Sequence, residues 1–168
     1  SEAADLVADS DEADSQTVDL EVQTIDTNVG GPTVYDDDAP VTLPDREAIT
    51  ISGEDDTVTV ESRFEILESV NENNHDISDL TIVNDDGGAA AIDVNSNNAQ
   101  SEFDNLNVTS DGTGVDVLTN GADVNVVNVT NSEFTVGDSG IVLNTAATDD
   151  DRDGFVIHNV TIDGPGIG

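Results

Sequence analysis

An internal repeat of 26 to 28 residues constrains the fold of this chain more than any other feature of its sequence. Four apolar–polar–apolar segments recur, and their first residues are 26, 28 and 26 positions apart. These segments are Leu80-Thr81-Ile82, Leu106-Asn107-Val108, Phe134-Thr135-Val136 and Val160-Thr161-Ile162. A polar residue precedes each segment, and an acidic turn that contains glycine follows it. A repeat of this length is typical of units that stack on copies of themselves.

The pattern within each repeat predicts strands rather than helices. Apolar and polar residues alternate, so one side of each segment is buried and the other faces solvent. If the repeats stack, Leu80, Leu106, Phe134 and Val160 form one inward column, and Ile82, Val108, Val136 and Ile162 form another. Thr81, Asn107, Thr135 and Thr161 then face outward. We expect glycine at corners that need a positive φ, and asparagine also tolerates that region.

The repeat resembles those of the right-handed parallel β-helices of the pectate-lyase-like superfamily. The resemblance covers residues 77–168 and, more weakly, 41–60. It implies an all-β fold: a right-handed parallel β-helix of about five coils, preceded by an irregular acidic N-terminal segment. A β-sandwich with hairpins of similar length is the alternative.

The chain divides into three predicted regions. Residues 1–16 form an acidic tail or tether, 17–40 an N-terminal strand and linker, and 41–168 the β-helix. Val18, Leu20 and Val22 alternate with polar residues in the second region. The last repeat stops in mid-coil at Gly168, so we expect either a longer natural chain or a partner subunit over that end.

Charge indicates the habitat. The chain has 38 acidic residues against three arginines, no lysine and no cysteine, and its net charge is −35. Intrinsic disorder is one interpretation, but the many Val and Ile residues in alternating runs favour a folded protein of molar salt. The dominance of aspartate and the absence of lysine are typical of extremely halophilic archaea, and hence also of their viruses. Three arginines cannot neutralise a nucleic acid backbone, and no apolar run is long enough to span a membrane.

One motif suggests a metal site, and Ca²⁺ is the candidate cofactor. Asp149, Asp151 and Asp153, followed by Gly154, match the first half of a calcium-binding loop of the EF-hand type. The twelfth position would be Val160 rather than a bidentate glutamate, so an acidic solvated loop is the alternative. The acids of the turns, Asp86, Asp111, Asp138 and Asp163, are a weaker candidate for a cation ladder.

Three asparagines are candidate N-glycosylation sites, since Asn107, Asn128 and Asn159 each begin an Asn-Val-Thr sequon. The alternative is that asparagine and threonine form sequons by chance in a repeat that favours both.

The sequence gives little support for catalysis. There is no lysine to act as a base, and neither His75, in a predicted loop, nor His158 has catalytic flanking residues. We expect a non-catalytic structural or recognition component of a cell surface or virion that contacts neighbouring subunits or surface glycans. A fragment of a secreted polysaccharide lyase or glycoside hydrolase and a calcium-dependent adhesin are the alternatives.

Overall fold

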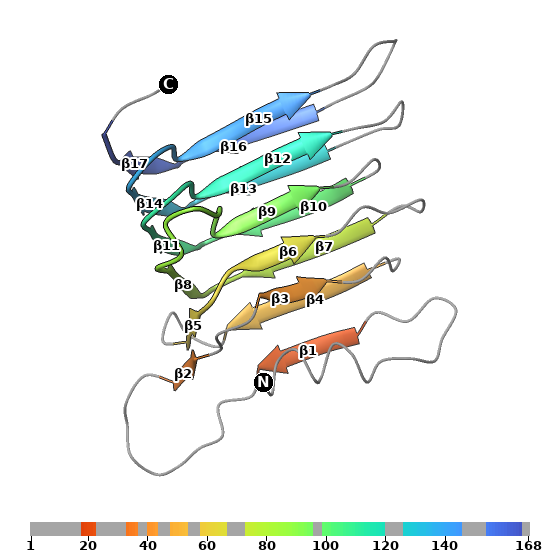
Figure 1. Ribbon diagram of the computed structural model, residues 1–168. Helices are drawn as coiled ribbons and strands as arrows, with labels where there is room; N and C mark the ends of the chain where they lie inside the picture. The colour runs from red at the N-terminus through yellow and green to blue at the C-terminus, as the bar shows by residue number, and fades with distance from the viewer. Residues whose placement is uncertain are drawn as a thin grey trace.

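A computed structural model shows an all-β protein built from parallel strands (Figure 1). It describes residues 18–22, 33–36, 40–43, 48–53, 58–66, 73–95, 99–119, 126–145 and 154–165. The 17 strands in these ranges form three sheets, here called A, B and C. In the described ranges no helix occurs that could cross a lipid bilayer.

Each sheet contains every third strand of the chain. Sheet A consists of β1 (Val18–Val22), β4 (Ala48–Gly53), β7 (Asn73–Ser78), β10 (Ala99–Asp104), β13 (Val126–Thr130) and β16 (Gly154–His158). Sheet B consists of β2 (Thr33–Asp36), β5 (Val58–Glu61), β8 (Thr81–Asn84), β11 (Asn107–Ser110), β14 (Glu133–Val136) and β17 (Thr161–Asp163). Sheet C consists of β3 (Val41–Leu43), β6 (Phe64–Ile66), β9 (Ile92–Asn95), β12 (Val115–Thr119) and β15 (Ile141–Thr145).

This order defines a parallel β-solenoid. The chain passes through sheets A, B and C in turn and then returns to A one strand further along, so three strands make a coil (Figure 1). Pairing of the described strands is parallel throughout, for example between β7 and β10 and between β8 and β11. The predicted all-β parallel solenoid is therefore confirmed, and the β-sandwich, which requires antiparallel hairpins, is wrong.

The first two strands belong to the same sheets as the repeats. β1 lies at the position where alternation predicts a strand, and it pairs with β4. β2, which the sequence did not suggest, pairs with β5. The predicted acidic tail, residues 1–16, lies outside the described residues.

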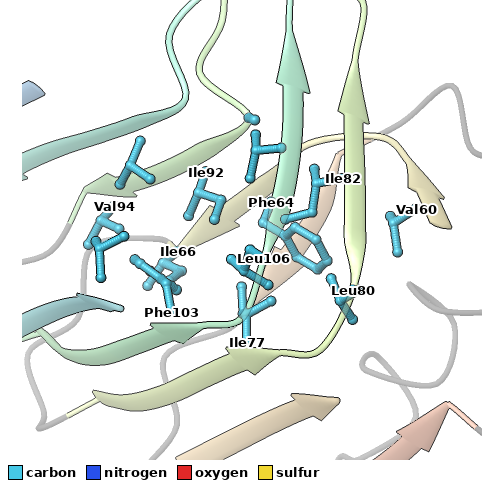
Figure 2. Packing of buried hydrophobic residues seen from close by; sticks show 14 of the residues in the cluster. Val60, Phe64, Ile66, Ile77, Leu80, Ile82, Ile92, Val94, Phe103 and Leu106 are labelled. Carbon is cyan, nitrogen blue, oxygen red and sulfur yellow. The ribbon is translucent and has the colours of Figure 1, made fainter. Parts of the chain in front are cut away.

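Side chains that alternate inward along the strands form the core (Figure 2). Leu80, Leu106 and Ile82 are at most 2% exposed, as predicted, and the outward Thr81 and Asn107 are not buried. Phe64, Phe103 and Phe134 fill the interior, and each is also at most 1% exposed. Because the coils are narrow, small β-branched residues and a few rings suffice to fill them.

The predicted register is wrong at Phe134. This residue pairs with Val108 and belongs to the column of Ile82, whereas Ser132 occupies the position of Leu106. The true steps along the column are 26, 26 and 28 residues, since Val160 follows Ser132. Side chains alternate with a period of two, so a slip of two residues leaves Phe134 facing inward. Val136 is likewise buried but pairs with Ser110.

Two positions at the corner between sheets B and C, Gly112 and Gly137, require glycine for lack of space. A Cβ atom on Gly137 would lie 2.2 Å from the carbonyl oxygen of Asp111, and one on Gly112 would lie 2.6 Å from that of Ala89. None of the glycines in the described corners has a positive φ, so the expected conformational reason is wrong. Successive coils approach so closely here that a side chain does not fit between them.

Candidate recognition groove

The corner between sheets A and B has the same form in the last four coils. In four coils it consists of two residues, the first of which has a positive φ of 51 to 57°. These first residues are Asp79, Asn105, Asn131 and Asn159. Aspartate and asparagine adopt this left-handed conformation more readily than other non-glycine residues, because their short polar side chains can hydrogen-bond locally.

Side chains at this corner link neighbouring coils. Asn105 Nδ2 donates to Asp79 Oδ1 over 2.9 Å, and Asn159 Nδ2 donates to Asn131 Oδ1 over 3.0 Å. Asn131 Nδ2 donates instead to Asp104 Oδ1, over 2.8 Å. The backbone N–H groups of Asp79, Asn105 and Asn131 donate to carbonyl groups of the next coil, so the corner continues the ladders of both sheets.

Two corner carboxylates accept several hydrogen bonds. Asp104 Oδ1 also accepts from Thr130 Oγ1 over 2.5 Å, and Asp79 Oδ2 accepts from Ser52 Oγ over 3.2 Å. Hydrogen bonds to an ionised carboxylate are stronger than those between neutral groups. At this corner, therefore, the carboxylates of Asp79 and Asp104 are surrounded by hydrogen-bond donors.

A shallow groove runs across the coils beside this corner. Its volume is about 360 Å³. Asn105, Asn131 and Asn159 of the corner line one part of it, and the first residues of four strands of sheet B line another. These four are Thr81, Asn107, Glu133 and Thr161. The groove is open to solvent and lined mainly by amides and hydroxyl groups.

The four strand residues form a row across sheet B. Asn107 pairs with Thr81 and with Glu133, and Glu133 pairs with Thr161, so one residue of the row stands on each coil. Asn107, Glu133 and Thr161 are exposed, and Thr81 is half-buried. Within the described part of the chain, the side chains of this row make no hydrogen bond or ion pair. Their polar groups are free to contact a ligand.

A second row of polar side chains, on the outer face of sheet C, is acidic. Glu65 pairs with Asp93, and Asp93 pairs with Asp116. Burial raises the pKa of Asp93, and the carboxylates of Asp116 and Glu65 raise it further, against a smaller opposite effect of Arg63. Burial also raises the pKa of Asp116. The sequence analysis did not predict this row, although the pattern is visible in the sequence. In β6, β9 and β12 an acid lies between two inward apolar residues.

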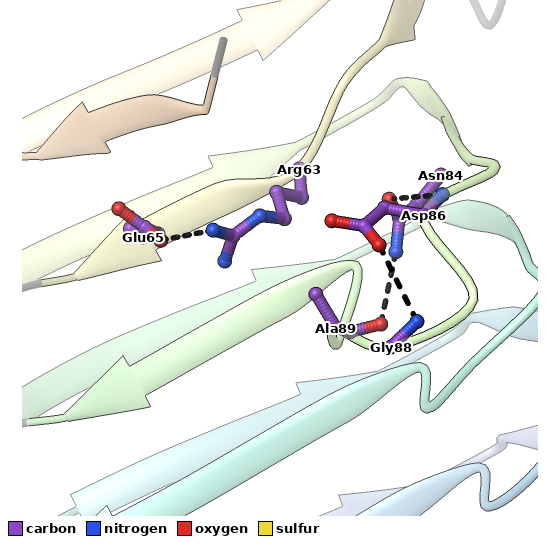
Figure 3. A network of polar contacts seen from close by, with 6 residues as sticks. All are labelled: Arg63, Glu65, Asn84, Asp86, Gly88 and Ala89. Carbon is purple, nitrogen blue, oxygen red and sulfur yellow. Dashed lines mark hydrogen bonds and ion pairs between the residues drawn. The ribbon is translucent and has the colours of Figure 1, made fainter.

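Arg63 and the long turn after β8 lie close to this face (Figure 3). The Arg63 guanidinium forms an ion pair with Glu65 over 2.5 Å. In the turn, buried Asn84 donates to the carbonyl oxygen of Ala89 over 3.0 Å, and the Asp86 carboxylate accepts from the Gly88 N–H group over 3.4 Å. These contacts order a turn that is longer than those in the following two coils.

The three sequon asparagines lie in different environments. Asn107 is exposed on β11 and belongs to the row in the groove. Asn159 is exposed at the corner, where its amide donates to Asn131. Asn128 is half-buried on β13, and its Oδ1 atom is enclosed without a hydrogen-bond partner in the described structure. Glycosylation of any of them stays a prediction.

The predicted calcium ligands Asp149, Asp151 and Asp153 lie outside the described residues. The four acids of the predicted cation ladder, Asp86, Asp111, Asp138 and Asp163, are exposed. They do not form one column along the solenoid, because Asp163 stands above Thr135 in the strand register, whereas Asp138 lies three residues further along the chain. Among the residues that the structure describes, no group of three or more acidic, histidine or cysteine side chains is arranged to hold a metal ion.

The two histidines lie in strands of sheet A. The prediction that His75 lies in a loop is wrong: it belongs to β7 and is fully buried, with Ser101 beside it in the register. Its neighbours Asn73, Asn74 and Asp76 are typical of turns, but parallel pairing on both sides of β7 overrides that local preference. His158, on β16, is exposed.

Comparison with known proteins adds no relative to this description. No model of a protein family matches the chain, and neither the curated proteins nor the solved structures include one that is detectably similar to it.

Proposed function

We propose that this chain is a non-catalytic structural and recognition component of an extracellular or virion surface assembly in an extreme halophile. It would act as a stiff shaft that contacts neighbouring subunits and presents its outer faces to the medium. The observation that carries the proposal is the stack of parallel strands in three sheets of six, six and five strands.

The stack favours a mechanical role because its coils are bonded continuously. Strand ladders run through all three sheets, and hydrogen bonds between coils continue through the corners, for example from Gly137 N to Ser110 O over 2.8 Å. A structure bonded in this way along its length resists bending and extension.

The distribution of charge supports the habitat. Among the residues whose side chains the structure describes, no acid is fully buried, and the exposed ones include Asp85, Glu102, Asp111 and Asp138. Repulsion between them extends over about 8 Å at 0.15 M salt but over only about 3 Å at 1 M. A surface with this charge is compatible with a compact fold when salt is concentrated.

Salt dilution tests the habitat. We expect the full chain to lose its β-sheet circular dichroism signal when KCl is diluted from molar to millimolar concentration, because repulsion among the acids is then no longer screened. A neutral osmolyte at the same osmolarity is the control for water activity. An unchanged spectrum in dilute buffer would contradict adaptation to molar salt.

Imaging tests the role. Antibody-labelled electron microscopy of native cells and virus particles should place the chain in a regular array on an outer surface. Labelling confined to the cell interior would overturn the proposal. Release of reducing ends from a polysaccharide by the purified chain would overturn its non-catalytic part.

A further inference from the structure

We propose that the groove beside the corner from sheet A to sheet B binds an uncharged oligosaccharide lying along the solenoid axis. This inference rests on the recognition part of the proposed function and names its ligand. It assigns a contact role to the row formed by Thr81, Asn107, Glu133 and Thr161.

The first argument is the spacing of the row. Its members stand on four successive coils, and neighbouring strands lie about 4.8 Å apart. A ligand that follows the row must therefore present polar groups at a similar repeat. One hexose unit of an extended oligosaccharide is of this length, so each coil can contact about one sugar.

The second argument is hydrogen-bonding chemistry. Sugar hydroxyl groups both donate and accept, and they are best matched by groups that do the same. The amide of Asn107 donates and accepts, as do the hydroxyl groups of Thr81 and Thr161, whereas the Glu133 carboxylate accepts. These side chains make no hydrogen bond within the described part of the structure, so a ligand does not have to displace one.

The third argument is rigidity. The row follows directly on the corner, where Asn105 and Asn131 are tied to carboxylates of the preceding coil. Backbone N–H groups at the start of the strands are also bonded to that coil, as from Asn107 N to Leu80 O over 3.0 Å. A prearranged surface loses less conformational entropy when it binds a ligand.

Electrostatics selects an uncharged ligand. Glu133 lies in the row, Asp79 and Asp104 lie at the adjacent corner, and no lysine occurs in the chain. An anionic polymer would be repelled. Attraction of a cationic peptide by these acids would be screened in molar salt, whereas hydrogen bonds to hydroxyl groups would persist.

The groove predicts weak binding at each site. It is shallow and has no aromatic ring among its lining residues, so we expect a Kd of about 1 mM for a tetrasaccharide. Many copies on one surface would raise the overall affinity through multivalency.

Nitrogen-15 NMR titration of the full chain in molar KCl tests the inference. The probes are cellotetraose and mannotetraose, with tetragalacturonate and tetralysine as charged comparisons. The variants are Asn107→Ala, in the row, and Thr109→Ala, which removes another exposed outward side chain of β11 outside the groove.

We expect at least one neutral tetrasaccharide to shift the side-chain amide signals of Asn107 and Asn131. Asn107→Ala should weaken binding at least fivefold, and Thr109→Ala less than twofold. The inference is overturned if neither neutral probe shifts these signals, if both variants respond alike, or if a charged probe binds better. These failures would leave the shaft role intact, because that role is tested by imaging and salt dilution.

Discussion

The two corners on either side of sheet B turn the chain by different means. At the corner from A to B, the first residue takes a left-handed conformation and is aspartate or asparagine in four coils. At the corner from B to C, glycine is needed at Gly112 and Gly137 although no described glycine has a positive φ, because the neighbouring coil leaves no room for a Cβ atom at these positions. One corner is limited by backbone conformation and the other by space.

The difference determines what each corner can do. A side chain at the first corner projects from the coil and can bond to a neighbouring coil, as Asn105 does to Asp79 of the preceding coil. Glycine at the second corner contributes only a close approach of backbones. The groove therefore lies beside the first corner, where polar side chains gather.

The largest expected loss of stability comes from placing a charge in the buried column that contains Leu80 and Leu106. Leu106→Asp places a carboxylate at a position that is 2% exposed, next to Leu80 on the preceding coil. We expect a loss of more than about 4 kcal/mol, enough to leave the chain unfolded in molar KCl. Circular dichroism is the measurement, and Asn107→Asp, on the exposed neighbour, should change stability by less than about 0.5 kcal/mol. A native spectrum for Leu106→Asp would refute the inward assignment.

The next largest effect is expected at the glycine corner. Gly137→Ala would put a methyl group against the backbone oxygen of Asp111, which cannot move without breaking the ladder. We expect a loss of about 3 kcal/mol in urea unfolding.

Gly87→Ala is the matched control for this substitution. The nearest atom to a Cβ there is the Cβ of Asp111 at 3.7 Å, an ordinary contact, so stability should change by less than about 0.5 kcal/mol. Equal losses in the two variants would mean that space does not explain glycine at this corner.

The fold could be predicted from the sequence because the same apolar–polar–apolar pattern recurs in four repeats. Alternation places Leu80, Ile82 and Leu106 inward whatever the pairing partner is, and the period requires stacking. The predicted register is wrong because Ser132 does not look like a core residue, so the alternation was aligned on Phe134 instead. It occupies an inward position by donating to Thr130 O over 2.7 Å and accepting from Leu106 N over 3.1 Å.

The candidate groove could not be predicted in the same way. Its row combines Thr81, Asn107, Glu133 and Thr161, which belong to three residue types, and only the true register aligns Glu133 with Asn107. The predicted slip of two residues places Thr135 there instead. A surface site on a solenoid depends on register, whereas the buried pattern tolerates an even slip.

A smaller effect is expected from the left-handed residues. Asn131→Ala loses the hydrogen bond to Asp104 and forces alanine into a conformation that costs about 1–2 kcal/mol. We expect a total loss of about 2 kcal/mol in urea unfolding.

Asn131→Gly separates the two causes, because glycine adopts a positive φ without strain but lacks the side chain. It should cost about 1 kcal/mol, less than alanine. If alanine were tolerated as well as glycine, backbone conformation would not be the constraint at this corner.

The carboxylates on opposite sides of the solenoid extend the comparison to charge. Asp104, at the corner from A to B, accepts hydrogen bonds from Thr130 and Asn131. Asp93, on sheet C, instead lies between Glu65 and Asp116 in the strand register. One side therefore surrounds its acids with hydrogen-bond donors, and the other places acids next to each other.

The smallest effect is expected from Asp93→Asn, and its sign is favourable. Burial and two neighbouring carboxylates raise the pKa of Asp93 in the folded state, so the folded chain binds a proton more tightly than the unfolded chain does. Stability of the parent protein must then fall as pH rises from the ordinary value of 3.8 through the raised one. The amide removes this cost, and we expect a gain of about 0.5 kcal/mol at neutral pH, since the half-exposed site is screened by solvent. The gain should shrink in acid and at higher salt, as measured by urea unfolding.

Asp104→Asn removes the same charge but weakens the hydrogen bonds from Thr130 and Asn131, so it should lower stability. A gain in both variants would indicate that total charge, rather than the placement of each acid, limits the stability of this solenoid.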